Sequence, residues 1–126
     1  MKPIETVPAY IQFMQTHPEV TTCPIRRTLE VVGGKWKIFI VLQLFDAPSC
    51  RFGALSRRVE GITNTMLSSC LRELERDGMV EREQFNEIPP HVEYRLTEEG
   101  KSLASVLLAL ANWGLEHPED RQEGIK

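Results

Sequence analysis

Residues 63–77, Thr63 to Asp77, have the sequence TNTMLSSCLRELERD, and they decide the fold of this chain. Leu67, Leu71 and Leu74 recur at the i, i+4, i+7 spacing that predicts the buried side of an α-helix. The opposite side carries short hydrogen-bonding groups and two guanidinium groups, from Thr65, Ser68, Ser69, Arg72 and Arg76. Such groups can bond to base edges and phosphates in the major groove of DNA. The stretch therefore predicts an amphipathic helix whose outer side is suited to DNA.

The residues before this helix predict a shorter partner helix. Residues 52–59 are amphipathic at helical spacing, and only residues 60–62, with Gly61 at their centre, separate them from the long helix. Two helices joined by a short glycine-containing turn, the second polar outward, form the helix-turn-helix pattern. We expect Thr63 to cap the second helix, because its hydroxyl can accept from a free backbone N–H, and Gly78 to end it. The pattern favours a DNA-binding regulator.

Three more helices are expected on the N-terminal side. One covers Pro8–Thr16, with proline in the first turn. A second begins with Cys23 and Pro24 and ends at Gly33-Gly34, because glycine tolerates the left-handed geometry of a helix C-terminus. The third covers Trp36–Phe45, which is nearly all apolar and therefore predicts a fully buried central helix.

The hydrophobic period changes after Gly78. Residues 79–85 and 92–96 predict two strands, because Val92, Tyr94 and Leu96 alternate with charged residues as in a strand with one wet face. The connection at residues 86–91 is too rich in proline to continue the ladder, so the two strands should form a hairpin with a projecting loop, or wing.

A final helix is expected to begin at residues 97–99, where the two glutamates suit the positive end of the helix dipole. Its apolar residues cover more than one side, so it needs a second partner, and a dimer interface is the simplest one. The predicted fold class is mainly α with a small β-hairpin (α+β): a winged helix-turn-helix with N- and C-terminal dimerisation helices. The expected segments are an N-terminal helix and linker (1–22), the DNA-binding domain (23–96), the dimerisation helix (97–116) and a mobile acidic tail (117–126).

Charge is distributed unevenly in the 126 residues. The net charge of −3 argues mildly against a nucleic-acid binder. Between residues 23 and 72, however, eight basic residues stand against three acidic ones, Glu30, Asp46 and Glu60. The basic ones are Arg26, Arg27, Lys35, Lys37, Arg51, Arg57, Arg58 and Arg72. This asymmetry suits a protein with one DNA-facing surface.

Other functional classes find little support. Unbroken apolar runs such as residues 38–42 are too short to span a bilayer, and the N-terminus lacks the apolar core of a signal peptide, so a cytoplasmic protein is expected. The three cysteines are widely spaced, which disfavours a disulfide scaffold and a structural zinc site. The sequence has no phosphate-binding glycine loop and no metal-ligand spacing among its histidines. We therefore expect neither an enzyme nor a cofactor or metal.

The candidate DNA contacts fall into three groups. Asn64, Thr65, Ser68, Ser69 and Arg72 are assigned to base edges, because the N-terminal part of a recognition helix enters the groove deepest. Arg76 is assigned to a phosphate or to a salt bridge with Glu73. The remaining candidates for the DNA backbone are Arg51, Arg57, Arg58, Lys35, His91 and Arg95. The alternative for the arginines is that they are ordinary surface charges. For Lys35, and for the nearby Lys37, the alternative is that the side chain snorkels over the core beside a buried Trp36. For His91 the alternative is an exposed loop histidine with no role in binding.

Cys23 is the candidate redox sensor. With Pro24 at the first helical position, Cys23 should be the N-cap, where the helix dipole and the following Arg26 and Arg27 lower a thiol pKa. The alternative is a small buried hydrophobe, the commonest fate of a free cysteine. Cys50 and Cys70 are weaker candidates, and Cys70 is expected to pack at the edge of the leucine stripe.

Four stretches together resemble the HxlR-type winged-helix transcription regulators, relatives of the MarR type. They are CPIRRTLEVVGGKWK (23–37), RFGALSRRVEGIT (51–63), MLSSCLRELERDGMVERE (66–83) and IPPHVEYRLTEEGKSL (88–103). The resemblance implies a bacterial homodimeric repressor or activator, and in some members the cysteine at the position of Cys23 senses electrophiles or oxidants. The sequence departs from the family at readout positions, where it has Asn64, Thr65, Ser69, Cys70 and His91, so no operator sequence carries over.

Three hypotheses follow. The first is a homodimer that binds an inverted-repeat operator in double-stranded DNA. The second adds a response to an oxidant, an electrophile or a small aromatic effector, with Cys23 forming an inter-subunit disulfide to Cys50 or Cys70 as one route. The third is a winged-helix module that binds proteins and does not recognise DNA specifically, which the net acidity slightly favours.

Overall fold

The computed structural model describes residues 2–119, and the chain divides into two compact units, Met1–Gly33 and Gly34–Lys126. The first unit holds α1 (Val7–Thr16) and α2 (Pro24–Val32). The Thr6 hydroxyl caps α1 by accepting from the backbone N–H of Ala9 at 3.1 Å. Cys23 is the N-cap of α2, as predicted. Gly33 ends α2 in extended backbone, and the left-handed residue is the next glycine, Gly34, at φ 86°.

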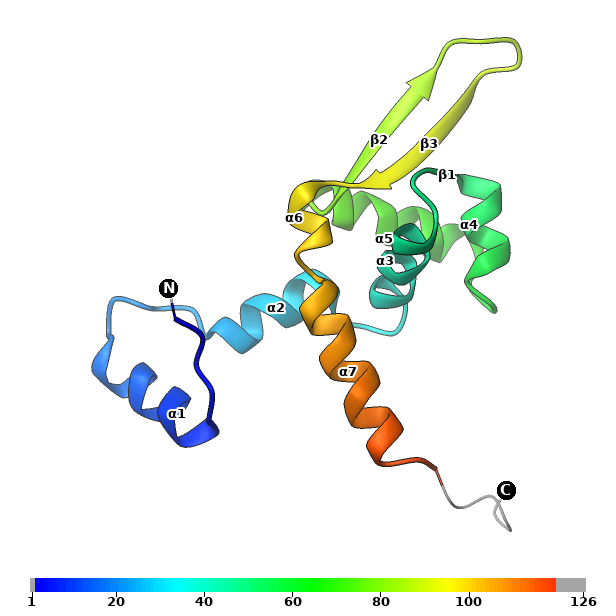
Figure 1. Ribbon diagram of the computed structural model, residues 1–126. Helices are drawn as coiled ribbons and strands as arrows, with labels where there is room; N and C mark the ends of the chain where they lie inside the picture. Colours follow the sequence, from blue (N-terminus) through cyan, green and yellow to red (C-terminus); the bar gives the residue numbers. More distant parts are fainter. Residues whose placement is uncertain (1, 120–126) are drawn as a thin grey trace. The chain divides into compact units, whose positions relative to one another are not determined.

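The second unit has the winged-helix order (Figure 1). It runs through α3 (Lys37–Asp46), β1 (Cys50–Arg51), α4 (Phe52–Arg58), α5 (Asn64–Arg76), β2 (Val80–Phe85), β3 (His91–Leu96), α6 (Glu98–Lys101) and α7 (Ala104–Glu116). The strands form an antiparallel sheet in the order β1-β3-β2. The predicted α+β winged helix-turn-helix is confirmed. The sequence did not reveal β1, because its two residues are too short to show an alternating pattern.

The core of this unit lies under α5. Leu67, Leu71 and Leu74 are at most 1% exposed, so the predicted stripe is the buried side of the helix. Burying a leucine fully stabilises a fold by about 1.5–3 kcal/mol, and these three residues therefore hold α5 firmly in place. Leu55 of α4 and Ile40 of α3 are fully buried as well, which joins the three helices into one core.

The prediction that residues 36–45 form a fully buried helix is wrong. On α3, Ile40, Val41 and Leu44 are buried, but Phe39 is 51% exposed and Leu42 is 45% exposed. The reason is geometric: the neighbouring elements cover one side of α3 fully, and within the described residues its other apolar side stays about half exposed. The composition of the segment could not distinguish burial within a protomer from burial by a partner.

The C-terminal helix also differs from the prediction, because it is divided into α6 and α7. Thr97 caps α6 by accepting from the N–H of Gly100 at 2.9 Å. The first segment then closes with a short-range bond from the N–H of Leu103 to the carbonyl of Gly100 at 3.1 Å. Such an i to i+3 bond tightens the turn, and α7 begins after it.

No residue of α7 is buried within the described protomer. Leu108, Leu110, Trp113 and Leu115 are between 57% and 78% exposed. No helix among residues 2–119 is long and apolar enough to cross a membrane. Residues 120–126 of the predicted acidic tail lie outside the described residues.

Candidate nucleic-acid interface

The outer side of α5 is open to solvent in the protomer. Asn64, Thr65 and Arg72 are exposed, and Ser68 and Ser69 are half-buried. The Thr63 hydroxyl caps the helix by accepting from the N–H of Met66 at 3.1 Å. All five residues assigned to base edges therefore lie on one accessible side of a helix that is fixed to the core by its opposite side.

The turn between α4 and α5 sets the position of the second helix. Gly61 has φ 88°, which is the left-handed region where glycine has no steric penalty. The next residue, Ile62, is buried and anchors the turn. The Ser56 hydroxyl of α4 donates to Oδ1 of Asn64 at 3.1 Å. This bond joins the two helices at the end of α5 that would enter a groove, and it leaves the amide nitrogen of Asn64 for a base.

The hydroxyl of Ser68 orients the main cation on this side. Nη1 of Arg72 donates to Oγ of Ser68 at 3.2 Å. This neutral contact does not compensate the positive charge of Arg72, so the guanidinium keeps most of its hydrogen-bonding capacity for an anion.

Two cations at the end of α4 differ in their surroundings. Arg58 is paired with Asp46 at 3.2 Å, and that carboxylate is 76% exposed. Arg57 is exposed, and none of the ion pairs within residues 2–119 includes it. A surface ion pair contributes little to stability, so the pairing of Arg58 is weak enough to be exchanged for a phosphate.

Arg51 is exposed on β1, opposite Glu93 in the sheet register.

The structure separates the two lysines beside Trp36. Lys37 is 8% exposed, and its Nζ lies 2.7 Å from Oε1 of Glu73, so it joins α3 to α5. Lys35 is exposed and lies over the ring of Trp36, 4.8 Å from its centroid. Trp36 itself is half-buried, so the predicted burial of this residue is only partial.

Arg76 does not form the salt bridge that the sequence suggested. Its Nε lies 3.9 Å from the neighbouring Asp77, and the carboxylate of Glu73 is bonded to Lys37 instead. The same bond, followed by the charge of Lys37, lowers the pKa of Glu73. Arg76 is exposed, so its assignment to a phosphate stays a prediction.

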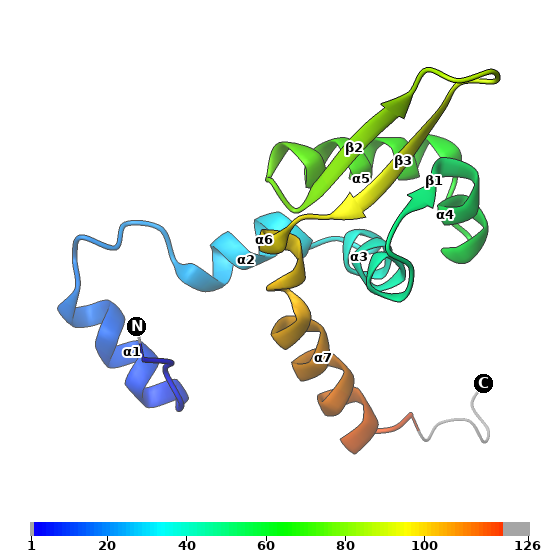
Figure 2. The same ribbon diagram turned by 45° about the horizontal axis from the view of Figure 1, so that its top comes forward.

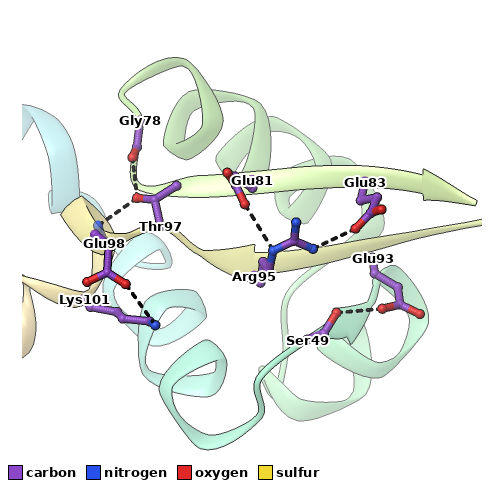
Figure 3. A network of polar contacts seen from close by, with 10 residues as sticks. Ser49, Gly78, Glu81, Glu83, Glu93, Arg95, Thr97, Glu98 and Lys101 are labelled. Carbon is purple, nitrogen blue, oxygen red and sulfur yellow. Dashed lines mark hydrogen bonds and ion pairs between the residues drawn. The ribbon is translucent and has the colours of Figure 1, made fainter.

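Acidic residues flank Arg95 on the wing. Nε of Arg95 lies 3.1 Å from Glu81 and its Nη1 lies 2.8 Å from Glu83, in one row along the hairpin (Figure 3). The bond to Glu83 is the main cause of a raised pKa for Arg95. Two carboxylates compensate this guanidinium, which weighs against the predicted contact with DNA.

His91 is neither an exposed loop histidine nor an open wing contact. Its ring stacks on Phe85 at 4.8 Å, and its side chain is 13% exposed. Nε2 lies 3.0 Å from Glu93 and Nδ1 lies 3.8 Å from Glu87. Glu93 also accepts from the Ser49 hydroxyl at 2.7 Å, and this bond is the first cause of its lowered pKa. The histidine therefore ties the loop to the hairpin.

The thiol of Cys23 has a partner that sequence reasoning missed. Its Sγ lies 3.0 Å from the hydroxyl of Tyr10, and this bond is the main cause of a lowered pKa for Cys23, ahead of the backbone amide of Arg26. The helix N-terminus had suggested the direction of the shift, but no local pattern connects residues thirteen positions apart. Cys50 and Cys70 are buried, and burial raises the pKa of Cys70.

Two further surface features lie in the second unit. An apolar groove of about 350 Å³ runs between α3 and α7, lined by Ile38, Phe39, Leu42, Leu107, Leu108, Leu110 and Ala111. Trp36 and Phe39 line a more polar hollow beside Lys35 and Arg58. Among residues 2–119, no cluster of three metal-ligating side chains is present.

Comparison with known proteins places these features in a family. The family model described as HxlR-like helix-turn-helix matches residues 31–122. An uncharacterized HTH-type transcriptional regulator of Bacillus subtilis (strain 168), YdeP, is 42% identical over 104 residues, which cover 82% of this chain and 80% of YdeP.

Solved structures agree with this placement. The redox regulator HypR in its oxidized form superposes with a TM-score of 0.71 at 42% identity, covering 78% of this chain and all (100%) of that one. The putative HTH-type transcriptional regulator ytcD superposes with a TM-score of 0.73 at 44% identity, covering 76% and 97%. The chain therefore belongs to the HxlR-like helix-turn-helix family and is a transcriptional regulator that binds DNA through a winged helix.

Proposed function

We propose that this regulator acts as a cytoplasmic homodimer that binds an inverted-repeat operator and catalyses no reaction. Asn64, Thr65, Ser68, Ser69 and Arg72 of α5 read base edges in the major groove. The phosphate contacts come from Arg51, Arg57 and Arg58, with Lys35 and Arg76 at the margins. The observation that carries this proposal is the exposed outer side of α5, joined to α4 by the bond from Ser56 to Asn64.

The dimer part of the proposal is supported by apolar surface that the protomer does not cover. The outer side of α3 and most of α7 are apolar and largely exposed, with Trp113 at 64% and Leu115 at 78%. An exposed apolar surface of this kind marks an interaction site in a soluble protein. A second copy would cover it, and the two recognition helices would then read half-sites about 34–36 Å apart or a multiple of that distance.

Binding to DNA upstream of the protein's own gene tests the operator proposal. We expect tight, salt-sensitive binding of that duplex and footprints on two symmetric half-sites. Arg72→Ala should weaken specific binding by about 10- to 100-fold, while Lys101→Ala, which removes an equal charge from α6, should not. Binding no tighter than to random DNA would contradict the proposal and favour the protein-interaction alternative.

A second function, thiol sensing, is favoured by the bond between Cys23 and Tyr10. A hydrogen bond from the phenol to the sulfur stabilises the thiolate, which is the nucleophilic and oxidisable form. HypR is described as a redox regulator with oxidized and reduced structures, and the likeness to it supports a sensing role for Cys23. Cys50 and Cys70 are buried in this conformation, which makes them poor partners for the predicted inter-subunit disulfide.

Three variants test the sensor, and one of them, Cys70→Ser, is the control. Cys23→Ser should abolish any change in DNA binding caused by diamide, while Cys70→Ser should not. Tyr10→Phe should slow the alkylation of Cys23 by iodoacetamide near neutral pH, because the thiol pKa returns toward its ordinary value. A full diamide response in Cys23→Ser would remove this residue from the mechanism.

A further inference from the structure

The two faces of the wing hairpin differ in charge. Side chains alternate along β2 and β3, and the cross-strand register assigns each residue to a face. One face carries Glu81, Glu83, Phe85, His91, Glu93 and Arg95. The other carries Val80, Arg82, Gln84, Val92, Tyr94 and Leu96. Residues 80–96 include four glutamates. The three that belong to the strands, Glu81, Glu83 and Glu93, all lie on the first face, so the second face has no acidic residue.

The acid-free face is also the face that packs against the helices. Val80 and Leu96 at its base are 2% and 7% exposed. Tyr94 lies opposite Cys50, which is buried too. Beyond this base the hairpin projects on the side of α4, as Figures 1 and 2 show, so its outer part extends from the same unit as the helix-turn-helix.

Arg82 is the cation of the acid-free face. It is exposed, and no ion pair within residues 2–119 includes it. β2 is an edge strand of the sheet, so no further strand covers Arg82 from the side. Arg95, in contrast, would have to give up two carboxylates before it could bind a phosphate.

We infer that Arg82, and not Arg95 or His91, is the residue through which the wing binds the DNA phosphate backbone. The inference rests on the proposed function. Arg82 acts as a positioning residue: a phosphate contact fixes the register of the protein on the duplex and carries no sequence information. The carboxylates of the opposite face repel the duplex, so they keep the wing in one orientation, with its acid-free face toward the DNA.

The test measures fluorescence anisotropy of the upstream duplex, and of a random duplex, at several salt concentrations. Arg82→Gln keeps most of the side-chain volume and removes the charge. It should weaken binding of both duplexes by a similar factor, roughly tenfold, and lower the salt slope by about one per protomer. Arg82→Lys should keep the slope. Arg95→Gln, the matched control on the other face, should leave the slope unchanged.

Two results would overturn the inference: an Arg82→Gln protein that binds with the affinity and salt slope of the wild type, or a reduced slope in Arg95→Gln alone. Arg72→Ala separates this outcome from failure of the proposed function. If Arg72→Ala weakens specific binding and Arg82→Gln does not weaken DNA binding, only the proposed role of Arg82 is disproved. If the wild type itself does not prefer its upstream duplex, the proposed function falls, and the inference falls with it.

Discussion

Helices α5 and α7 have the same length, thirteen residues, and opposite surroundings. In α5, four residues are buried, and the outer side is polar. In α7 no residue is buried, although the helix has no charged residue before Glu116. The comparison shows that an amphipathic helix can be held by its own protomer and offer its other side to DNA. An apolar helix that the described protomer leaves largely exposed has its apolar surface available to a second copy.

The largest expected effect is a difference in the free energy of unfolding between variants of α5 and variants of α7. Leu71→Ala removes side-chain atoms from a site that is 1% exposed, and we expect a loss of about 2–5 kcal/mol in the free energy of unfolding. Leu108→Ala, at a site 61% exposed, should change this free energy by no more than about 0.5 kcal/mol in dilute protein. Urea titrations measure both values. Equal losses would mean that the two helices are covered to the same extent within the protomer.

The next effect concerns self-association. Trp113 of α7 is 64% exposed in the protomer, and large aromatic residues dominate the binding energy of many interfaces. Trp113→Ala should raise the dissociation constant of the dimer at least tenfold, as measured by sedimentation over a range of concentrations. Ser105→Ala, at an exposed polar position of the same helix, is the control. A monomeric wild type at all concentrations would disprove the role of α7.

A smaller effect comes from the helix caps. The Thr63 hydroxyl caps α5, whereas the N-cap of α7, Leu103, makes no side-chain cap bond. Thr63→Ala should therefore lower the free energy of unfolding by about 1 kcal/mol, and Thr63→Ser should retain most of it. If alanine and serine destabilise equally in thermal unfolding, the cap bond is not the cause.

The smallest effect is a pH dependence of the contact between α3 and α5. Lys37 lowers the pKa of Glu73 below its ordinary value of 4.5. Because the folded-state pKa lies below the unfolded one, this stabilisation is complete above about pH 4.5 and is lost as the pH falls through the folded value. The Lys37→Met variant should lose less stability than the wild type between pH 6 and pH 3. If the free energies of unfolding of the wild type and of Lys37→Met fall in parallel over this pH range, the ion pair does not contribute to stability.

The local features of the fold could be predicted from the sequence. The leucine stripe, the Thr63 cap and the glycine turn depend on residues a few positions apart, and the predicted α5 agrees with the structure within a residue at each end. Burial of α3 could not be predicted in this way. Phe39 and Leu42 are as apolar as Ile40, and only the arrangement of neighbouring helices decides which of them is covered.

Most of the contacts that the site residues make could not be predicted from the sequence. Arg95 was predicted as a DNA contact because it is a cation next to the wing, but the strand register places it beside Glu81 and Glu83. The bond between Tyr10 and Cys23 depends on how the chain between α1 and α2 turns. Such pairings can be identified only from the three-dimensional structure, whereas the exposed side of α5 can be predicted from the helical period alone.

The most direct test of the central claim compares α5 and α7 in one experiment, by following the backbone amide resonances of ¹⁵N-labelled protein as the upstream duplex is added. We expect the resonances of Asn64, Thr65 and Ser69 to shift strongly, while those of residues 108–115 of α7 keep their positions. Shifts confined to α7, with the resonances of α5 unchanged, would contradict it.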